Sequence, residues 1–285
     1  MSRLHTFGCS ITQGHALPDI VTPVRDSQGR ELEPDQVQQL MTEGTVSWED
    51  IHQYQASRFA WPQVLADRLG FPVNNHARRG ACFNQIARQV AQHGHTIEPD
   101  DVVIVMWTYM SRVSIQWPTR TAVPFCNIAD SSWGFRSMVL GFNRLFGLSN
   151  SKKDEHVDTQ EWIRDTAERV HLDPRGQFDR YYRNLTLQIM TDGYLRNTGA
   201  GVIHLSVETE SALDQTQRAQ QELDDELGKE YTMTPDPREW YTLQVDYNCA
   251  PTILDPRIPL APNDMHPSVE HHSEFARLIE RRYFL

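Results

Sequence analysis

Two segments at opposite ends of the sequence carry residues suited to acyl transfer. Ser10 follows a glycine in the run Gly8-Cys9-Ser10, while Asp264 and His266 lie together near the other end. A serine hydroxyl attacks an acyl carbon only when a base takes its proton, histidine is the usual base near neutral pH, and a carboxylate holds that histidine in the productive tautomer. These residues therefore predict a nucleophile (Ser10), a general base (His266) and an orienting acid (Asp264).

Such a site also needs hydrogen-bond donors for the negative oxygen of the tetrahedral intermediate. Backbone N–H groups at strand-to-helix turns suit this task, and glycine permits the sharp turn. The amides of Ser10 and Gly80 are the candidates in this sequence. Gly80 has a second interpretation, in which it serves only as a backbone turn.

The elements that must position these residues are short strands that alternate with helices. Strands are predicted at residues 4–7, 72–77, 102–107 and 202–207. The third is a continuous apolar run, typical of a parallel strand that is covered on both faces. Helices are predicted from Trp61 to Leu69, through Phe83 to Val90, through Tyr182 to Ile189 and from Pro267 to Phe284. The alternation predicts a parallel α/β sheet, whose carboxyl edge would bring the candidate residues together.

Two long stretches, at about 109–175 and 208–260, interrupt the alternation and are interpreted as insertions. They contain helix candidates through Trp162 and Val170 and around residues 215–227. The polar stretch from about 13 to 55 is predicted to be a surface excursion that adds little to the core. Since no repeat or linker is evident, we expect one domain over residues 1–285.

Composition excludes several classes of function. The 285 residues include 27 Lys and Arg against 38 Asp and Glu, a net charge of −11, which disfavours binding to nucleic acid. No stretch approaches the length of a membrane span, and the N-terminus lacks the apolar run of a signal peptide, so we expect a cytoplasmic or virion-associated protein. The four cysteines are scattered and predict reduced thiols, with Cys9 and Cys82 packed as small apolar residues.

No cofactor or metal is expected. The sequence has neither a phosphate-binding loop nor a dinucleotide-binding glycine pattern. The pairs His93/His95 and His271/His272 could suggest a metal, but histidines adjacent on a helix point to different faces. We interpret these histidines as part of a solvated face.

The chemistry-bearing segments resemble the conserved blocks of the SGNH, or GDSL, hydrolases, which have a three-layer αβα fold with a flavodoxin-like sheet. The first block resembles residues 7–12, with Cys9 where the commonest motif has aspartate. Gly80 resembles the glycine of the second block, and the run from Asp264 to His266 resembles the last block. The resemblance implies Ser10 as nucleophile, His266 as base and Gly80 as an oxyanion donor. It covers both ends and the strand scaffold but not the two insertions.

The sequence departs from this family pattern at two places. The asparagine of the third block has no counterpart, and Thr108 stands there as a possible donor. The family's carboxylate lies three residues before the histidine, where this chain has Asn263, with Asp264 only two before. The run from Trp107 to Arg112 resembles that of a divergent branch of this family, which is often met in phage and environmental sequences.

Trp107 and Arg112 are candidates for substrate binding. Arg112 has an alternative role as the partner of an acid in the insertion. The tryptophans of the first insertion (Trp117, Trp133 and Trp162) suit the faces of sugar rings, although they could instead belong to a core.

Together these observations predict a cofactor-independent serine esterase. It would form an acyl-enzyme and cleave a short O-acyl group from a carbohydrate-like substrate, with lipid esters and thioesters as further options. The rival hypothesis is a degenerate hydrolase domain with a binding or structural role, for example in a virus particle. The missing asparagine and the displaced aspartate favour this rival. The two hypotheses differ in whether a histidine lies within hydrogen-bond reach of Ser10.

Overall fold

A computed structural model describes residues 2–32, 34–43, 45–46, 51, 55–109, 113–116, 122–125, 174–208, 243–261 and 266–285 of the chain. Its elements follow in the order β1 (Leu4–Phe7), α1 (Ser10–Gln13), α2 (Pro34–Glu43), α4 (Trp61–Leu69), β2 (Val73–Asn75), α5 (Phe83–His93), η1 (Gly94–Thr96), β3 (Val102–Trp107), β4 (Val113–Gln116), β5 (Ala122–Phe125), α8 (Pro174–Arg196), β6 (Gly201–Ser206), β7 (Val245–Asp246), α10 (Ala250–Ile253) and α11 (Val269–Tyr283).

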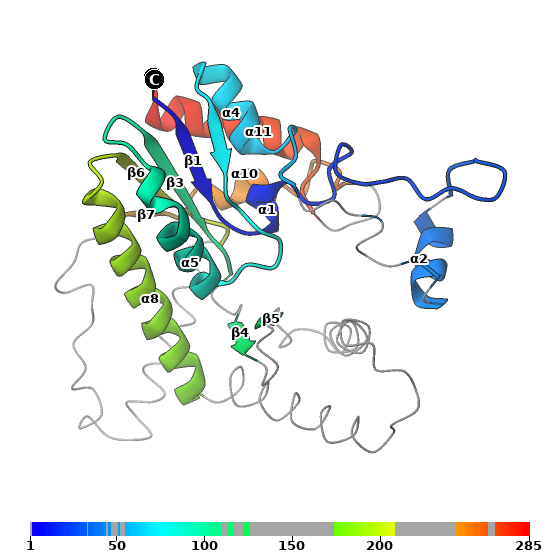
Figure 1. The fold of residues 1–285 in the computed structure, drawn as a ribbon, viewed down its shortest axis with the longest axis horizontal. Coiled ribbons are helices and arrows are strands. Elements are labelled where there is room, and N and C mark those ends of the chain that lie inside the picture. The colour runs from blue at the N-terminus through cyan, green and yellow to red at the C-terminus, as the bar shows by residue number, and fades with distance from the viewer. Residues whose placement is uncertain are drawn as a thin grey trace.

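The central sheet has five parallel strands in the order β2-β1-β3-β6-β7 (Figure 1). In its register Phe7 lies opposite Val105, and Trp107 lies opposite Ser206, so β1, β3 and β6 end at a common edge. This strand order is that of flavodoxin-like folds, in which ligands bind beyond the carboxyl ends of the strands. The predicted α/β class with a parallel sheet is confirmed.

Helices cover both faces of the sheet and make it the middle of three layers. Helices α4 and α11 pack against each other on one face, and α5 and α8 pack together on the other (Figure 1). Side chains alternate between the faces along each strand, as the pleat requires. On one face Trp107 of β3 stacks on Phe83 of α5. On the other face Trp61 of α4 packs edge to face against Phe275 of α11. The core therefore has two halves, one on each side of the sheet.

Local sequence signals explain the helix boundaries. Helix α4 has Pro62 in its first turn, where a missing N–H costs nothing, and it ends at Gly70 with φ of +69°. Helix α5 turns Phe83, Ile86 and Val90 toward the core, as their spacing predicts. These helices and the strands β1 and β3 lie where the sequence predicts them.

The polar stretch after α1 differs from its prediction. It adds fully buried side chains, including Leu17 and Ile20, and it contains helix α2. The sparse apolar residues of this stretch have no helical or strand period, which is why the sequence pattern did not show their burial. The end of the second insertion likewise supplies β7 and α10, so it completes the sheet.

The first insertion is described only in part. Its strands β4 and β5 form an antiparallel pair with Val113 opposite Phe125. The helices predicted through Trp162 and around residues 215–227 lie outside the described residues. Among the residues that are described, no helix is long and apolar enough to cross a membrane.

Candidate active site

Ser10 lies at the carboxyl end of β1, in a turn that only glycine can begin. A β-carbon at Gly8 would come within 2.7 Å of Cβ of Thr12 and 3.2 Å of the carbonyl oxygen of Met106, and it would also collide with the Thr12 hydroxyl. The chain then enters the short helix α1, with Cys9 at its N-cap and Ser10 as its first residue. The strand, the glycine turn and this helix therefore hold Ser10 at the edge of the sheet, with 3% of its surface exposed.

His266 lies against Ser10, although 256 residues separate them in the sequence. Its Nε2 atom is 2.9 Å from the Oγ atom of Ser10. In the tautomer with the proton on Nδ1, Nε2 accepts the hydrogen bond that the serine hydroxyl donates. The imidazole is partly buried. This pair has the separation that general-base activation of a serine requires.

The backbone around His266 is fixed by hydrogen bonds on both sides. The amide of Ala261 donates to the carbonyl oxygen of His266 at 2.9 Å. Two residues later, Ser268 caps helix α11, and its amide donates to Nδ1 of His271 at 3.2 Å. His271 in turn donates from Nε2 to the carbonyl oxygen of Asp255 at 2.9 Å. The start of α11 thus sets the place of the histidine that precedes it.

The Gly80 turn is tied to the Ser10 turn by three hydrogen bonds. The amides of Arg78 and Arg79 donate to the carbonyl oxygen of Gly8 at 3.1 Å and to Oε1 of Gln13 at 2.8 Å. The side-chain amide of Asn75 donates to the carbonyl oxygen of Thr12 at 2.8 Å. Gly80 itself has φ of +71°, in the left-handed region that favours glycine. The two predicted glycine turns are therefore joined at one edge of the sheet.

Thr108 and Trp107 follow one another where β3 ends, and both side chains are fully buried. The indole Nε1 of Trp107 donates to Nδ1 of His204 at 3.0 Å, and Nε2 of His204 donates to Asp192 at 2.9 Å. Trp107 also stacks on Phe83, with ring centroids 5.1 Å apart. The indole thus contacts protein atoms and not an open surface. No sequence pattern pointed to its partners His204 and Asp192.

Several predicted site residues lie outside the described residues. They include Asn263 and Asp264, which precede His266, and Arg112, which follows the end of β3. The tryptophans of the first insertion also fall there. Of the predicted triad, the structure therefore describes Ser10 and His266 and brings these two together.

A second histidine, which the sequence analysis missed, contacts the His266 ring. His15 packs edge to face against it, with ring centroids 4.9 Å apart and an angle of 78° between the planes. His15 follows directly after Gly14, which ends α1, and only 4% of its surface is exposed. A histidine five positions after the candidate nucleophile was the one signal in the sequence, and by itself it indicates nothing.

The prediction of a solvated face is wrong for His271 and His272, because both are fully buried. His271 caps α11, and Nδ1 of His272 accepts a hydrogen bond from the amide of Trp61 at 3.1 Å. Burial lowers the pKa of His272 to about 3. Among the described residues, no group of three or more His, Cys, Asp or Glu side chains has a geometry that could hold a metal ion.

Another group of histidines lies on the α5 face of the sheet. The rings of His5, His76 and His93 stack in turn, with His76 and His93 centroids 4.2 Å apart. Nε2 of His5 lies 3.2 Å from a carboxylate oxygen of Asp101. Burial, together with the neighbouring imidazoles of His93 and His5, lowers the pKa of His76 to about 4. Near neutral pH the imidazole of His76 is therefore uncharged.

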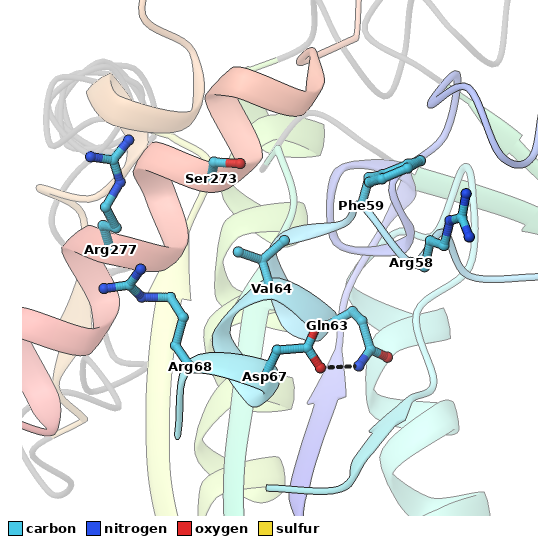
Figure 2. A pocket seen from close by; sticks show the side chains of 8 residues that line it. All are labelled: Arg58, Phe59, Gln63, Val64, Asp67, Arg68, Ser273 and Arg277. Atoms are coloured by element: carbon cyan, nitrogen blue, oxygen red, sulfur yellow. Dashed lines mark hydrogen bonds between the residues drawn. The ribbon is translucent and has the colours of Figure 1, made fainter. Parts of the chain in front are cut away.

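A groove of about 700 Å³ runs between α4 and α11, away from the Ser10–His266 pair. Its lining residues are Arg58, Phe59, Gln63, Val64, Asp67, Arg68, Ser273 and Arg277 (Figure 2). Arg68 and Arg277 form ion pairs with Glu280 and Glu274. Neither Ser10 nor His266 lines the groove, so it is separate from the candidate active site.

Comparison with known proteins supplies two distant structural neighbours. No family model matches the chain, and no curated protein matches it. An acetyl xylan esterase from the rumen bacterium Butyrivibrio proteoclasticus has 11% sequence identity and a TM-score of 0.40, and the match covers 99% of this chain. The chain spans 64% of the length of that esterase.

An extracellular lipase from Streptomyces rimosus has 11% identity and a TM-score of 0.31, with 99% of each chain covered. At such scores neither neighbour bears on the function of the site.

Proposed function

We propose that this protein is a carboxylic ester hydrolase of the SGNH type, with Ser10 as nucleophile and His266 as general base. The observation that carries the proposal is the 2.9 Å separation of Nε2 of His266 from Oγ of Ser10 at the carboxyl edge of a parallel sheet. A serine in a turn that begins with glycine and a histidine from the far end of the chain have no structural need to meet there. Activation of the serine as a nucleophile by the histidine explains why they do.

The reaction would proceed in two steps. Oγ of Ser10 attacks the acyl carbonyl while Nε2 of His266 takes the hydroxyl proton, and the proton then passes to the departing alcohol oxygen. This leaves an acyl-enzyme on Ser10. A water molecule gives its proton to His266, attacks the ester carbonyl and releases the acid, and the proton returns to Oγ of Ser10.

Three groups would stabilise the tetrahedral intermediate and one would orient the base. The amides of Ser10 and Gly80 and the hydroxyl of Thr108 are the proposed oxyanion donors. The links from Arg78 and Arg79 to the Ser10 turn support this placement of Gly80. Asp264 is the proposed partner of the second nitrogen of His266, since a carboxylate stabilises the imidazolium that forms during the reaction.

The proposed substrate carries a short acyl group, such as acetyl, on a carbohydrate-like alcohol. Ser10 is only 3% exposed and His266 is partly buried, so a small acyl group fits the approach to the nucleophile better than a long chain. The carbohydrate part of the proposal comes from the tryptophan-rich first insertion. Arg112 would bind an anionic group of the substrate or an acid of that insertion.

Covalent labelling with a fluorophosphonate probe tests the proposal directly. We expect the native protein to take up one probe per chain, with the adduct on the Ser10 peptide by mass spectrometry. Ser10→Ala should abolish labelling. Ser273→Ala is the matched control, because Ser273 donates to the carbonyl oxygen of Val269 within α11 and should label as the wild type does. An unlabelled native protein, or an adduct elsewhere, would refute the proposal and favour a structural role for the domain.

A further inference from the structure

The side chain of His266 is restrained by a neighbour that the proposed reaction does not use. The ring of His15 lies edge to face with it, at 4.9 Å between centroids. We infer that His15 is a positioning residue that holds the His266 imidazole in the orientation that points Nε2 at Ser10. This inference rests on the proposed function, and it adds a residue that the family resemblance did not suggest.

The chain turns sharply to bring His15 to this place. Helix α1 ends at Gly14, with φ of +80°, and the carbonyl oxygen of Ser10 accepts hydrogen bonds from the amides of both Gly14 and His15 at 2.9 Å. His15 is therefore attached to the backbone of the nucleophile itself. A shift of His15 relative to Ser10 would break a hydrogen bond at the first residue of α1.

The next residue shows that this turn is strained. Ala16 has φ of +67°, and within the described part of the chain it is the one residue other than glycine with a positive φ. Such a conformation is unfavourable for an L-residue and persists only where the surroundings enforce it. The residues on either side are closely packed, since Leu17 is fully buried and a β-carbon at Gly14 would lie 2.6 Å from Cβ of Ala60. This turn lies directly after His15, whose ring contacts that of His266.

The contact acts on the torsion of the His266 ring about its Cβ–Cγ bond, which is intrinsically broad in an imidazole. Hydrogen bonds at Ala261 and Ser268 fix the backbone around His266, and the His15 ring adds a contact on the side chain itself. Rotation about the Cβ–Cγ bond moves Nε2 away from Oγ. Edge-to-face is one of the two arrangements that aromatic rings prefer, so the His15 contact favours the observed orientation of the His266 ring. His15 thereby keeps the base within reach of the proton that it must take.

The test compares the 285-residue chain with three variants at His15. The variants His15→Ala and His15→Gln remove the ring, whereas His15→Phe keeps a ring that can pack edge to face. The readouts are the rate of Ser10 labelling by a fluorophosphonate, kcat and KM for p-nitrophenyl acetate, and Tm. We expect both ringless variants to lose about 10- to 100-fold in kcat and in labelling rate, because a misplaced base lowers the reactive fraction. KM should stay within about two-fold, since the substrate is still bound.

The conservative variant separates positioning from folding. His15→Phe should recover the labelling rate to within about three-fold of the wild type, because it restores the ring contact. If His15→Ala does not fold, the comparison of His15→Gln with His15→Phe still contrasts a side chain without a ring with one that has a ring. The exposed His95 provides the matched control, and His95→Ala should leave all readouts unchanged.

Two results would overturn the inference while leaving the proposed function intact. The first is a ringless variant that labels at the wild-type rate. The second is a Phe variant as slow as the ringless ones, which would mean that the imidazole nitrogens matter and not the ring contact. A wild-type protein that is not labelled at all would instead refute the proposed function, and the role of His15 with it.

Discussion

His272 makes the stability of the fold sensitive to acid, and the size of the effect follows from its burial. The side chain is fully buried, and its Nδ1 atom accepts a hydrogen bond from the amide of Trp61. Among the described residues its Nε2 atom has no hydrogen-bond partner, so a protonated ring would carry an uncompensated charge. Burial, together with the nearby His271 and His266, lowers the pKa from the ordinary 6.5 to about 3.

The sign of the effect comes from the difference in protonation between the two states. Below pH 6.5 the unfolded chain binds a proton at His272, whereas the folded chain does not until the pH approaches 3. The stability that the neutral ring provides is therefore complete above pH 6.5 and is lost as the pH falls. Each pH unit in this window lowers the free energy of unfolding by about 1.4 kcal/mol, so the change from pH 7.5 to 5 costs about 2 kcal/mol.

The variant His272→Asn isolates this contribution. The Asn side-chain oxygen can take the place of Nδ1 as acceptor for the Trp61 amide, but it does not titrate. The lost ring volume lowers stability by about 2 kcal/mol, equally at every pH. Between pH 7.5 and 5 the free energy of unfolding falls in both proteins. We expect this fall to be about 2 kcal/mol smaller for the variant than for the wild type.

Urea unfolding at a series of pH values measures this difference. His5 and His76, whose pKa values are also lowered by burial, contribute equally to both proteins and cancel. His95→Asn, at an exposed position, should follow the wild-type curve. Parallel curves for the wild type and His272→Asn would refute the reasoning, because they would mean that His272 does not titrate on unfolding in this range.

Three further expectations concern the site. Ser10→Ala and His266→Ala should each remove nearly all esterase activity without unfolding the protein, and the double variant should lose no more, as a kinetic assay with p-nitrophenyl acetate would show. Asp264→Asn should lower kcat by orders of magnitude while Asn263→Ala costs much less, and equal kinetics for Asp264→Asn and the wild type would contradict the orienting role. Gly8→Ala should lower the free energy of unfolding by about 1–3 kcal/mol and slow the labelling of Ser10, because its β-carbon collides with the buried side chain of residue 12.

The sequence by itself determined the elements whose signals are local. Pro62 and Gly70 delimit α4. A helix accommodates proline well only in its first turn, and glycine readily adopts the left-handed conformation that ends a helix. The apolar run of β3 predicts a buried strand because apolar side chains on both faces of a strand are stable only where both faces are covered. The sequence also singled out Ser10 and His266, since each lies in a short block with a recognisable order of residues.

The tertiary structure alone decided which distant groups meet. The 2.9 Å separation of Ser10 from His266 depends on the parallel register of the sheet and on the capped start of α11. The contact of His15 with His266 depends on a strained turn that no residue pattern specifies. The burial of the two histidines of α11 could not be predicted, because the hydrogen-bond partners that favour burial of a polar ring come from distant segments of the chain. For His272 that partner is the amide of Trp61, 211 residues away, and periodicity within one segment carries no information about such a pair.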